Sequence, residues 1–167
     1  LNLPHPGPTS RAFRHLNLRQ LLRSWYIFFF QIPRLPEWLL SRNNFALLRQ
    51  GMKASSLLGA FTDEDLDRYA RAWAQPGALS AMLGWYRAVM QTGLSPSRTR
   101  GLVHRIKVPT LILWGEHDPA LEVALAEQSM AWLDDGKLIR FPEATHWVHE
   151  DLPEEITQHL LRHFGSE

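Results

Sequence analysis

The chain has 167 residues, of which 45% are hydrophobic and 21% charged, so it is long and apolar enough to bury one globular core. Its net charge of +1, from 18 basic and 17 acidic residues, argues against a protein that binds nucleic acid electrostatically. The chain has no cysteine, which excludes disulfides and thiol chemistry. We find no apolar segment long enough to cross a bilayer and no secretory signal pattern, so we expect no membrane span and a cytoplasmic location.

The first third of the chain predicts helices separated by proline turns. Residues 1–6 contain two prolines and resemble the end of a strand that breaks into a loop. Residues 11–31 carry apolar side chains at spacings of three and four, which predicts a largely helical stretch with one apolar face that ends before Pro33. Two short helices are then expected, over residues 36–42 and 45–54. The chain starts with Leu rather than Met, and we expect it to be a segment of a longer protein.

The middle of the chain also predicts helices. Thr62 is followed by three acidic residues within the next turn, which is typical of a capped helix start, and we expect this helix to run to about Ala74. A further helix is predicted after Pro76, and a connecting helix over residues 95–106. We therefore assign residues 1–10 to the exit from a strand, residues 11–106 to a helical part that ends in a connecting helix, and residues 107–167 to a different kind of structure.

Residues 107–167 predict the order strand, helix, strand, helix. The apolar run that begins at Val108 ends at Gly115, and a second run spans Lys137 to Phe141. Short, continuous apolar runs bounded by turn residues are typical of buried parallel strands. Helices are expected over residues 121–133 and from Pro153 onward. The fold class predicted for the chain is α/β.

A polar side chain follows each predicted strand. Asp118 comes shortly after the first strand, and His146 comes shortly after the second. Parallel strands bring their carboxyl ends to one edge of the sheet, where α/β proteins place catalytic groups. A carboxylate that orients a histidine base is the acid–base pair of a catalytic triad, and the order acid then histidine is that of α/β-hydrolases. Asp118 and His146 are therefore predicted to be catalytic, whereas His149, three residues further on, is expected to point elsewhere.

The segments Trp114-Gly115-Glu116-His117-Asp118 and Thr145-His146-Trp147-Val148-His149-Glu150-Asp151-Leu152-Pro153 resemble the closing strands of the α/β-hydrolase family. The segments around Tyr26 and Tyr86 are similar to the two tyrosine-bearing segments in the helical cap of soluble epoxide hydrolases. Residues 1–6 resemble that family's exit from the strand before the cap. The resemblance implies a partial α/β-hydrolase fold, with a helical cap followed by the last two strands and helices of the parallel sheet.

The resemblance also implies a reaction. Tyr26 and Tyr86 would donate hydrogen bonds to the oxygen of an opening epoxide, and Asp118 and His146 would activate the water that releases a diol from an aspartyl ester. The substrate is expected to be small and apolar, and no cofactor or metal is implied. The aromatic residues expected to line its site are Trp25, Phe28, Phe29, Trp85 and Trp147.

One catalytic group has no counterpart in this sequence. The family's nucleophile lies on a G-x-D-x-G turn, and neither this pattern nor G-x-S-x-G occurs here. We therefore expect the N-terminal half of the fold to be supplied in cis or in trans. Alone, the chain should be inactive and should fold poorly or associate, because its first strand would have an unpaired apolar edge.

Other functions remain open. A haloalkane or haloacid dehalogenase uses the same aspartyl-ester chemistry with halide-binding Trp or His side chains in the cap, and a serine esterase or lactonase would need only Asp118 and His146. A hypothesis from a different class is a non-catalytic interaction module, which the missing nucleophile favours. Replacement of each tyrosine by phenylalanine would distinguish an epoxide hydrolase from a dehalogenase, because it should reduce epoxide turnover and spare a halide reaction.

Overall fold

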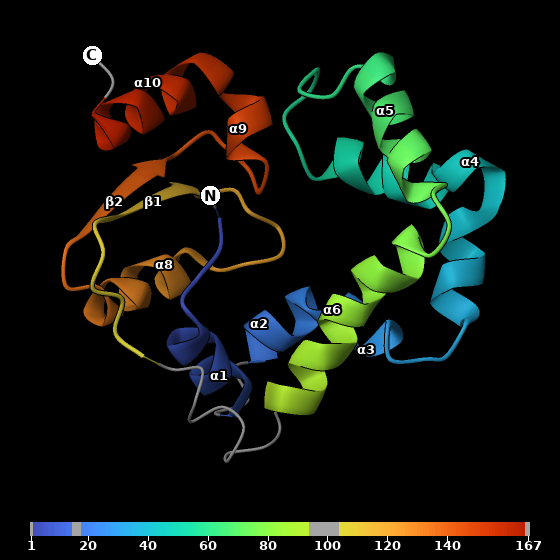
Figure 1. The fold of residues 1–167 in the computed structure, drawn as a ribbon, viewed down its shortest axis with the longest axis horizontal. Helices are drawn as coiled ribbons and strands as arrows, with labels where there is room; N and C mark the ends of the chain where they lie inside the picture. Colours follow the sequence, from blue (N-terminus) through green and yellow to red (C-terminus); the bar gives the residue numbers. More distant parts are fainter. Residues whose placement is uncertain (1, 15–17, 94–103, 166–167) are drawn as a thin grey trace.

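The computed structural model describes residues 2–14, 18–93 and 104–165 (Figure 1). Two strands lie between helices on either side, and a second group of helices stands beside this layered part. The predicted α/β class is confirmed: a helical region is followed by two parallel strands and their helices. None of the helices in the described ranges is both long and apolar enough to span a membrane.

The two strands form a parallel pair. β1 (Thr110–Gly115) aligns with β2 (Gly136–Phe141) so that Thr110 faces Gly136 and Gly115 faces Phe141. Both strands therefore end at the same edge of the sheet. β1 begins two residues later than the apolar run predicts, because Pro109 has no N–H to donate to a ladder.

Helices cover both faces of this sheet. On one face, α8 (Val123–Ser129) and the 3-10 helix η1 (Met130–Trp132) pack on Ile112 and Trp114 together with α1 (Pro6–Arg14). On the other face, α9 (Val148–Asp151) and α10 (Pro153–Phe164) pack on Leu113 and Phe141. A strand buried on both faces needs apolar side chains in both directions, which explains the continuous runs in the sequence.

The stretch of residues 11–31, predicted to be largely helical, is divided among several helices. The structure has three shorter helices here: α1, α2 (Leu18–Arg23) and α3 (Trp25–Phe29). The chain turns at Ser24, whose buried hydroxyl accepts a hydrogen bond from the side chain of Gln20 at 3.0 Å. A serine that bonds locally competes with the helical backbone, and this contact accompanies the break.

The remaining helices of the first part build their own core. They are α4 (Leu35–Ala54), α5 (Asp63–Trp73) and α6 (Ala78–Gly93). We call this group, with α3, the lid. Its buried side chains are Leu40, Phe45, Met52, Phe61, Leu66, Ala70, Trp73, Leu79 and Leu83, with Trp147 from the sheet part packed against them.

Two features of the lid agree with the sequence prediction. α4 contains a left-handed segment at Asn43, Asn44 and Phe45 (φ of 49°, 53° and 58°), which separates two helical stretches where two short helices were predicted. Asparagine accepts this conformation more readily than most residues. α5 begins with a capping box in which Thr62 accepts from the N–H of Asp65, and the Asp65 carboxylate accepts from the N–H of Thr62.

The predicted connecting helix over residues 95–106 falls mainly on residues 94–103, which lie outside the described residues. The prediction is wrong for its last residues. Ile106 forms a parallel bridge with Leu133, donating to the carbonyl of Trp132 at 2.8 Å and accepting from Asp134 at 2.9 Å. The β-branched side chain of Ile106 packs on the same face of the sheet as Leu133.

Candidate active site

Asp118 lies in the loop that follows β1, and its carboxylate accepts four hydrogen bonds. Oδ1 accepts from the main-chain N–H groups of Ala120 at 2.7 Å and Leu121 at 2.9 Å. Oδ2 accepts from Nδ2 of Asn2 at 2.8 Å and from Nδ1 of His146 at 2.7 Å. The residue is 2% exposed. A buried carboxylate needs this many donors, because each unpaired oxygen lone pair would carry a desolvation cost.

These bonds set the ionisation of Asp118. Burial by itself raises the pKa of its carboxyl. The hydrogen bond and the charge of His146, with the bonds from Asn2 and Leu121, outweigh burial and hold the pKa of Asp118 below its usual value. The carboxylate therefore stays ionised at neutral pH.

His146 lies in the loop between β2 and α9, at the same edge of the sheet as Asp118. An ionised carboxylate only accepts hydrogen bonds, so Nδ1 of His146 carries the proton that Asp118 binds, and in the neutral form of the ring Nε2 has the lone pair. The imidazole is about one-third exposed, with 35% of its side-chain surface accessible. The structure thus brings the two predicted residues together as an oriented acid–histidine pair with a basic nitrogen turned away from the acid.

Gly115 allows the two loops to come this close. A Cβ atom at this position would overlap the carbonyl oxygen of Thr145 and would lie 2.6 Å from that of Ala144. The N–H of His117 donates to the carbonyl of Ala144 at 2.9 Å, which ties the loop after β1 to the loop after β2. Glycine at the end of β1 is therefore required for the separation at which Asp118 meets His146.

The histidine loop is also attached to the lid. The carboxylate of Asp151 accepts from the N–H and hydroxyl of Thr145 at 2.7 and 2.5 Å, and from the N–H of Leu57 in the lid at 2.9 Å. Nε1 of Trp147 donates to the hydroxyl of Ser55 at 2.9 Å. Trp147, the residue next to His146, is thus hydrogen-bonded to the lid at the end of α4.

Tyr26 on α3 and Tyr86 on α6 form a pair in the lid. Their rings lie 5.8 Å apart in an edge-to-face arrangement, and Phe30 packs against both. Burial raises the pKa of Tyr26 to about 12, with further contributions from Tyr86 and from the negative charge of Asp118. Burial also raises the pKa of Tyr86. Both phenols therefore keep their protons at neutral pH, and a protonated phenol can donate a hydrogen bond.

Arg87 holds the elements that carry these tyrosines. Its guanidinium donates to the carbonyls of Phe30 at 2.8 Å and Ile32 at 3.2 Å, just beyond α3, and pairs with both oxygens of Glu37 at 2.6 and 3.1 Å. Arg87 thereby ties α6 to the end of α3 and to the start of α4. The sequence places Arg87 beside Tyr86 but has no signal for its partners, because they lie 50 to 57 positions away.

The predicted aromatic residues are placed in two groups. Trp25, Phe28 and Phe29 lie on α3, where Trp25 and Phe28 are 64% and 46% exposed, and Trp85 on α6 is 67% exposed. Phe29 is half-buried against Trp25, with ring centroids 6.4 Å apart. Trp147 belongs instead to the junction between His146 and the lid core. The exposed rings of Trp25, Phe28 and Trp85 therefore form apolar surface on the lid.

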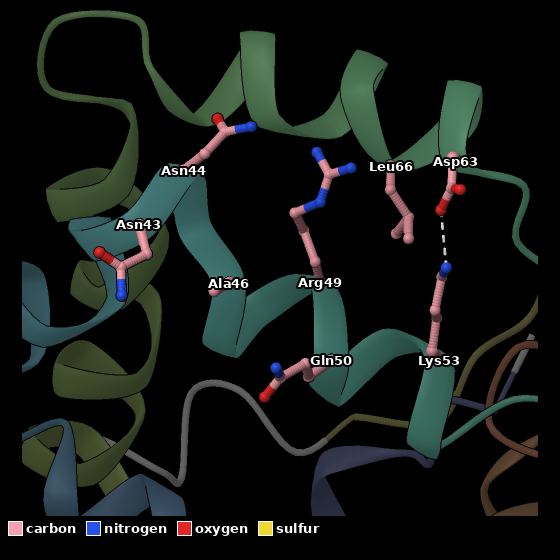
Figure 2. A pocket seen from close by; sticks show the side chains of 8 residues that line it. All are labelled: Asn43, Asn44, Ala46, Arg49, Gln50, Lys53, Asp63 and Leu66. Carbon is pink, nitrogen blue, oxygen red and sulfur yellow. Dashed lines mark hydrogen bonds and ion pairs between the residues drawn. The ribbon is translucent and has the colours of Figure 1, made fainter.

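An open pocket on the lid lies apart from these residues in the sequence. It has a volume of about 310 Å³ and is lined from α4 and α5, as Figure 2 shows, with Lys53 and Asp63 joined by an ion pair of 2.7 Å. Arg49, another lining residue, is paired with Asp67 at 2.7 Å. The charges in this pocket therefore have partners on the lid itself. No cluster of three potential metal ligands occurs among the described residues.

The sequence is similar to known hydrolases, although no protein-family model matches it. It is 35% identical over 167 residues to the AB hydrolase superfamily protein YfhM of Bacillus subtilis, covering the whole of this chain and 56% of that protein. It is 36% identical over 169 residues to human Epoxide hydrolase 4, covering 95% of this chain and 43% of that protein. The chain thus spans about half the length of these curated relatives.

The fold is similar to that of a solved hydrolase. The crystal structure of an epoxide hydrolase from Bacillus megaterium, in complex with an inhibitor, aligns with a TM-score of 0.77 over 97% of this chain and 57% of that one, at 23% sequence identity. The predicted partial fold, a helical cap followed by two parallel strands with their helices, is confirmed by this alignment. The chain belongs to the α/β-hydrolase superfamily, is epoxide hydrolase-like, and corresponds to the C-terminal portion of such a protein.

Proposed function

We propose that this chain supplies the lid and the acid–histidine pair of an enzyme that hydrates apolar epoxides to diols. The observation that carries the proposal is the pairing of two protonated tyrosines on the lid, Tyr26 and Tyr86. The negative charge of Asp118 contributes to the raised pKa of Tyr26. A phenol pair suits an epoxide because its ring oxygen becomes an alkoxide as the ring opens. The similarity to proteins named epoxide hydrolases supports the same assignment.

The proposed reaction has two steps. A carboxylate from the part of the fold outside this sequence attacks a ring carbon, the C–O bond breaks, and the oxygen takes a proton from Tyr26 or Tyr86. His146 then accepts a proton at Nε2 from a water, whose oxygen attacks the resulting ester and releases the diol and the carboxylate. The proton on His146 finally restores the phenol. Asp118 stabilises the positive charge that His146 carries in the second step.

The arrangement favours an epoxide over a halide substrate. Halide-binding caps use indole N–H or imidazole donors. Here Trp25 and Trp85 are about two-thirds exposed, and the indole N–H of Trp147 is donated to Ser55. The two tyrosines, in contrast, are half-buried and face each other. The exposed aromatic surface of α3 and α6 supports an apolar substrate.

The test is an assay of the protein expressed from the complete reading frame that contains these residues. We expect it to convert styrene oxide to the diol, and in ¹⁸O-water the first turnover should give unlabelled diol, because the enzyme carboxylate supplies the oxygen. Tyr26→Phe and Tyr86→Phe should each lower turnover about a hundredfold. His146→Gln should accumulate the ester, visible as a mass increase equal to the epoxide.

The matched control is Tyr69→Phe. The chain has three tyrosines, and Tyr69 packs in the lid core against Phe61 and Trp73. Its replacement removes a phenol of the same kind and should leave turnover unchanged. A folded protein that hydrolyses simple esters and not epoxides, or that is indifferent to loss of Tyr26 and Tyr86, would overturn the proposal in favour of an esterase.

A further inference from the structure

Asn2 lies beside β1 and uses its whole side chain for hydrogen bonds. Its Oδ1 accepts from the N–H of Gly115 at 2.8 Å. Its Nδ2 donates to Oδ2 of Asp118 at 2.8 Å and lies 3.3 Å from the carbonyl oxygens of both Gly115 and Thr145. One amide hydrogen is therefore directed to the carboxylate, and the other lies between the two carbonyls. The side chain joins the end of β1, the acid and the histidine loop at one point.

The backbone of Asn2 is held in an unusual conformation for this purpose. Its φ is 38°, in the left-handed region that few residues other than glycine and asparagine adopt, and its N–H donates to the carbonyl of Leu113 at 3.0 Å. The residue is 2% exposed. A conformation of this kind persists only where surrounding contacts determine it, so the amide is fixed in orientation.

The other groups around Asp118 have different roles. His146 shares Oδ2 with Asn2, whereas Arg23 on α2 donates to the main-chain carbonyl of Asp118 at 3.2 Å. Tyr26 on α3 is neutral, and the negative charge of Asp118 contributes to its raised pKa. Asn2 is thus a neutral side chain that bonds the same carboxylate oxygen as the imidazole, and the direction of the Asn2 amide fixes where that oxygen lies.

We propose that Asn2 is a positioning residue for the acid–histidine pair, holding Oδ2 of Asp118 where it orients Nδ1 of His146 and directs Nε2 to the substrate side. The effect of Asn2 on catalysis rests on the proposed function, whereas its effect on the Asp118–His146 pair does not. Without Asn2, the Asp118 carboxylate keeps the two main-chain donors on Oδ1 but loses one of the two donors on Oδ2. The carboxylate then rotates more freely, and the imidazole loses its single orientation.

The first test needs no substrate. In the protein expressed from the complete reading frame, NMR would follow the Asp118 carboxyl carbon, the Nδ1 proton of His146 and the side-chain amide of Asn2 through an acid titration. In the unaltered protein, the Asn2 amide signals should shift together with the ionisation of Asp118. In Asn2→Ala and in Asn2→Leu, which fills the volume, the Asp118 pKa should rise and the low-field Nδ1 proton signal should weaken or vanish.

Ser129→Ala is the matched control. Ser129 is fully buried, accepts from the N–H of His5 at 2.8 Å and donates to the carbonyl of Leu125 at 2.6 Å, so it anchors the same first segment without contacting the acid. This variant should lower stability and leave the Asp118 titration in place. The proposal would be overturned if the Asp118 pKa moved as far in Ser129→Ala as in the Asn2 variants. It would also be overturned if the Asn2 amide signals did not change as Asp118 ionises.

The second test separates this inference from the proposed function. If epoxides are hydrated, Asn2→Ala should lower kcat about tenfold with little change in KM. A change in KM alone would contradict a positioning role. If no epoxide is hydrated but the Asp118 titration shifts as expected, the proposed function fails and the structural role of Asn2 remains.

Discussion

At Asp118, burial and hydrogen bonding act in opposite directions on one carboxyl group. Burial favours the neutral form, whereas four donors and the neighbouring imidazole favour the anion and prevail. Burial has the opposite outcome at the two lid phenols, where it raises the pKa of Tyr86 and raises that of Tyr26 to about 12, so both stay neutral. The described residues thus include one buried anion at the sheet edge and two neutral phenols on the lid, and in the proposed reaction the anion would support the general base while the phenols would donate to the alkoxide.

This balance predicts how stability depends on pH. Because the folded pKa of Asp118 lies below its ordinary value of 3.8, the ionised group stabilises the fold above that value, and this contribution is lost as pH falls through the folded pKa. Asp118→Asn should remove this dependence, so the variant and the unaltered protein should differ at pH 6 and converge at low pH. Urea unfolding from pH 6 down to pH 2, which extends well below 3.8, measures this. Asp134→Asn, which removes an exposed ion pair with Arg105, is the control and should leave the dependence unchanged.

Among individual residues, the sequence predicts those whose position follows from neighbouring elements and misses those that depend on contacts between distant parts of the chain. Asp118 and His146 were predictable because each follows a strand, and the ends of parallel strands meet. Asn2 was not predictable, because Asp118, which its side chain contacts, lies 116 positions away, and hydrophobic periodicity does not reveal contacts between such distant residues. Asp151 was missed for the same reason, since it reaches Leu57 over 94 positions.

Among the elements, the lid depends on how α3 meets α6. Arg87 makes four contacts below 3.3 Å to the end of α3 and to Glu37, and this pairing raises the pKa of Arg87 and lowers that of Glu37 through their hydrogen bond. Because Tyr86 adjoins Arg87 and Tyr26 lies on α3, the arginine sets the separation of the two phenols. A bidentate guanidinium suits this task better than an ammonium group.

Arg87→Met is therefore expected to disturb the tyrosine pair. It keeps the aliphatic stem but removes the donors to Phe30, Ile32 and Glu37, so α3 should move relative to α6 and the near-ultraviolet circular dichroism of the lid aromatics should weaken. The stability loss should be about 1–3 kcal/mol, because a partly buried charge partner is left unpaired. Arg68→Met is the control: Arg68 is exposed and pairs with Glu64 one turn away, which contributes only a few tenths of a kcal/mol. Equal effects of the two substitutions would contradict the role of Arg87.

Element boundaries in the lid followed the sequence where local chemistry decides them. The cap at Thr62 acts within a few residues and was predicted, and the two helical stretches of α4 were predicted as two short helices. The extended pairing of Ile106 with Leu133 was not, because the partner strand segment, 27 positions along the chain, outweighs local helix preference. The break at Ser24 likewise depends on a side-chain contact that periodicity does not reveal.

Across the whole molecule, the lid and the sheet part meet at the histidine loop. Trp147 inserts into the lid core, and Asp151 bonds the loop to Leu57. The edge of β1 opposite β2 faces the first residues of the chain, where the N–H of Asn2 donates to Leu113. Large apolar side chains remain exposed on both parts, and the most open are Leu3, Leu18, Leu22, Trp25, Leu58, Trp85, Val108 and Phe164. A surface of this kind favours association.

We therefore expect the 167-residue polypeptide alone to form no diol from styrene oxide and to self-associate in sedimentation experiments as its concentration rises. Leu3 follows Asn2 and is 71% exposed, and Val108 lies two residues before β1 and is 64% exposed. The double variant Leu3→Lys, Val108→Lys should therefore reduce association by placing charge near the strand edge. Phe164→Lys, at the far end of α10 and 74% exposed, is the matched control and should have less effect. A compact monomer with a cooperative melt at all concentrations would contradict this expectation and favour an independent module, because such a chain would not need another half of the fold to cover its apolar surface.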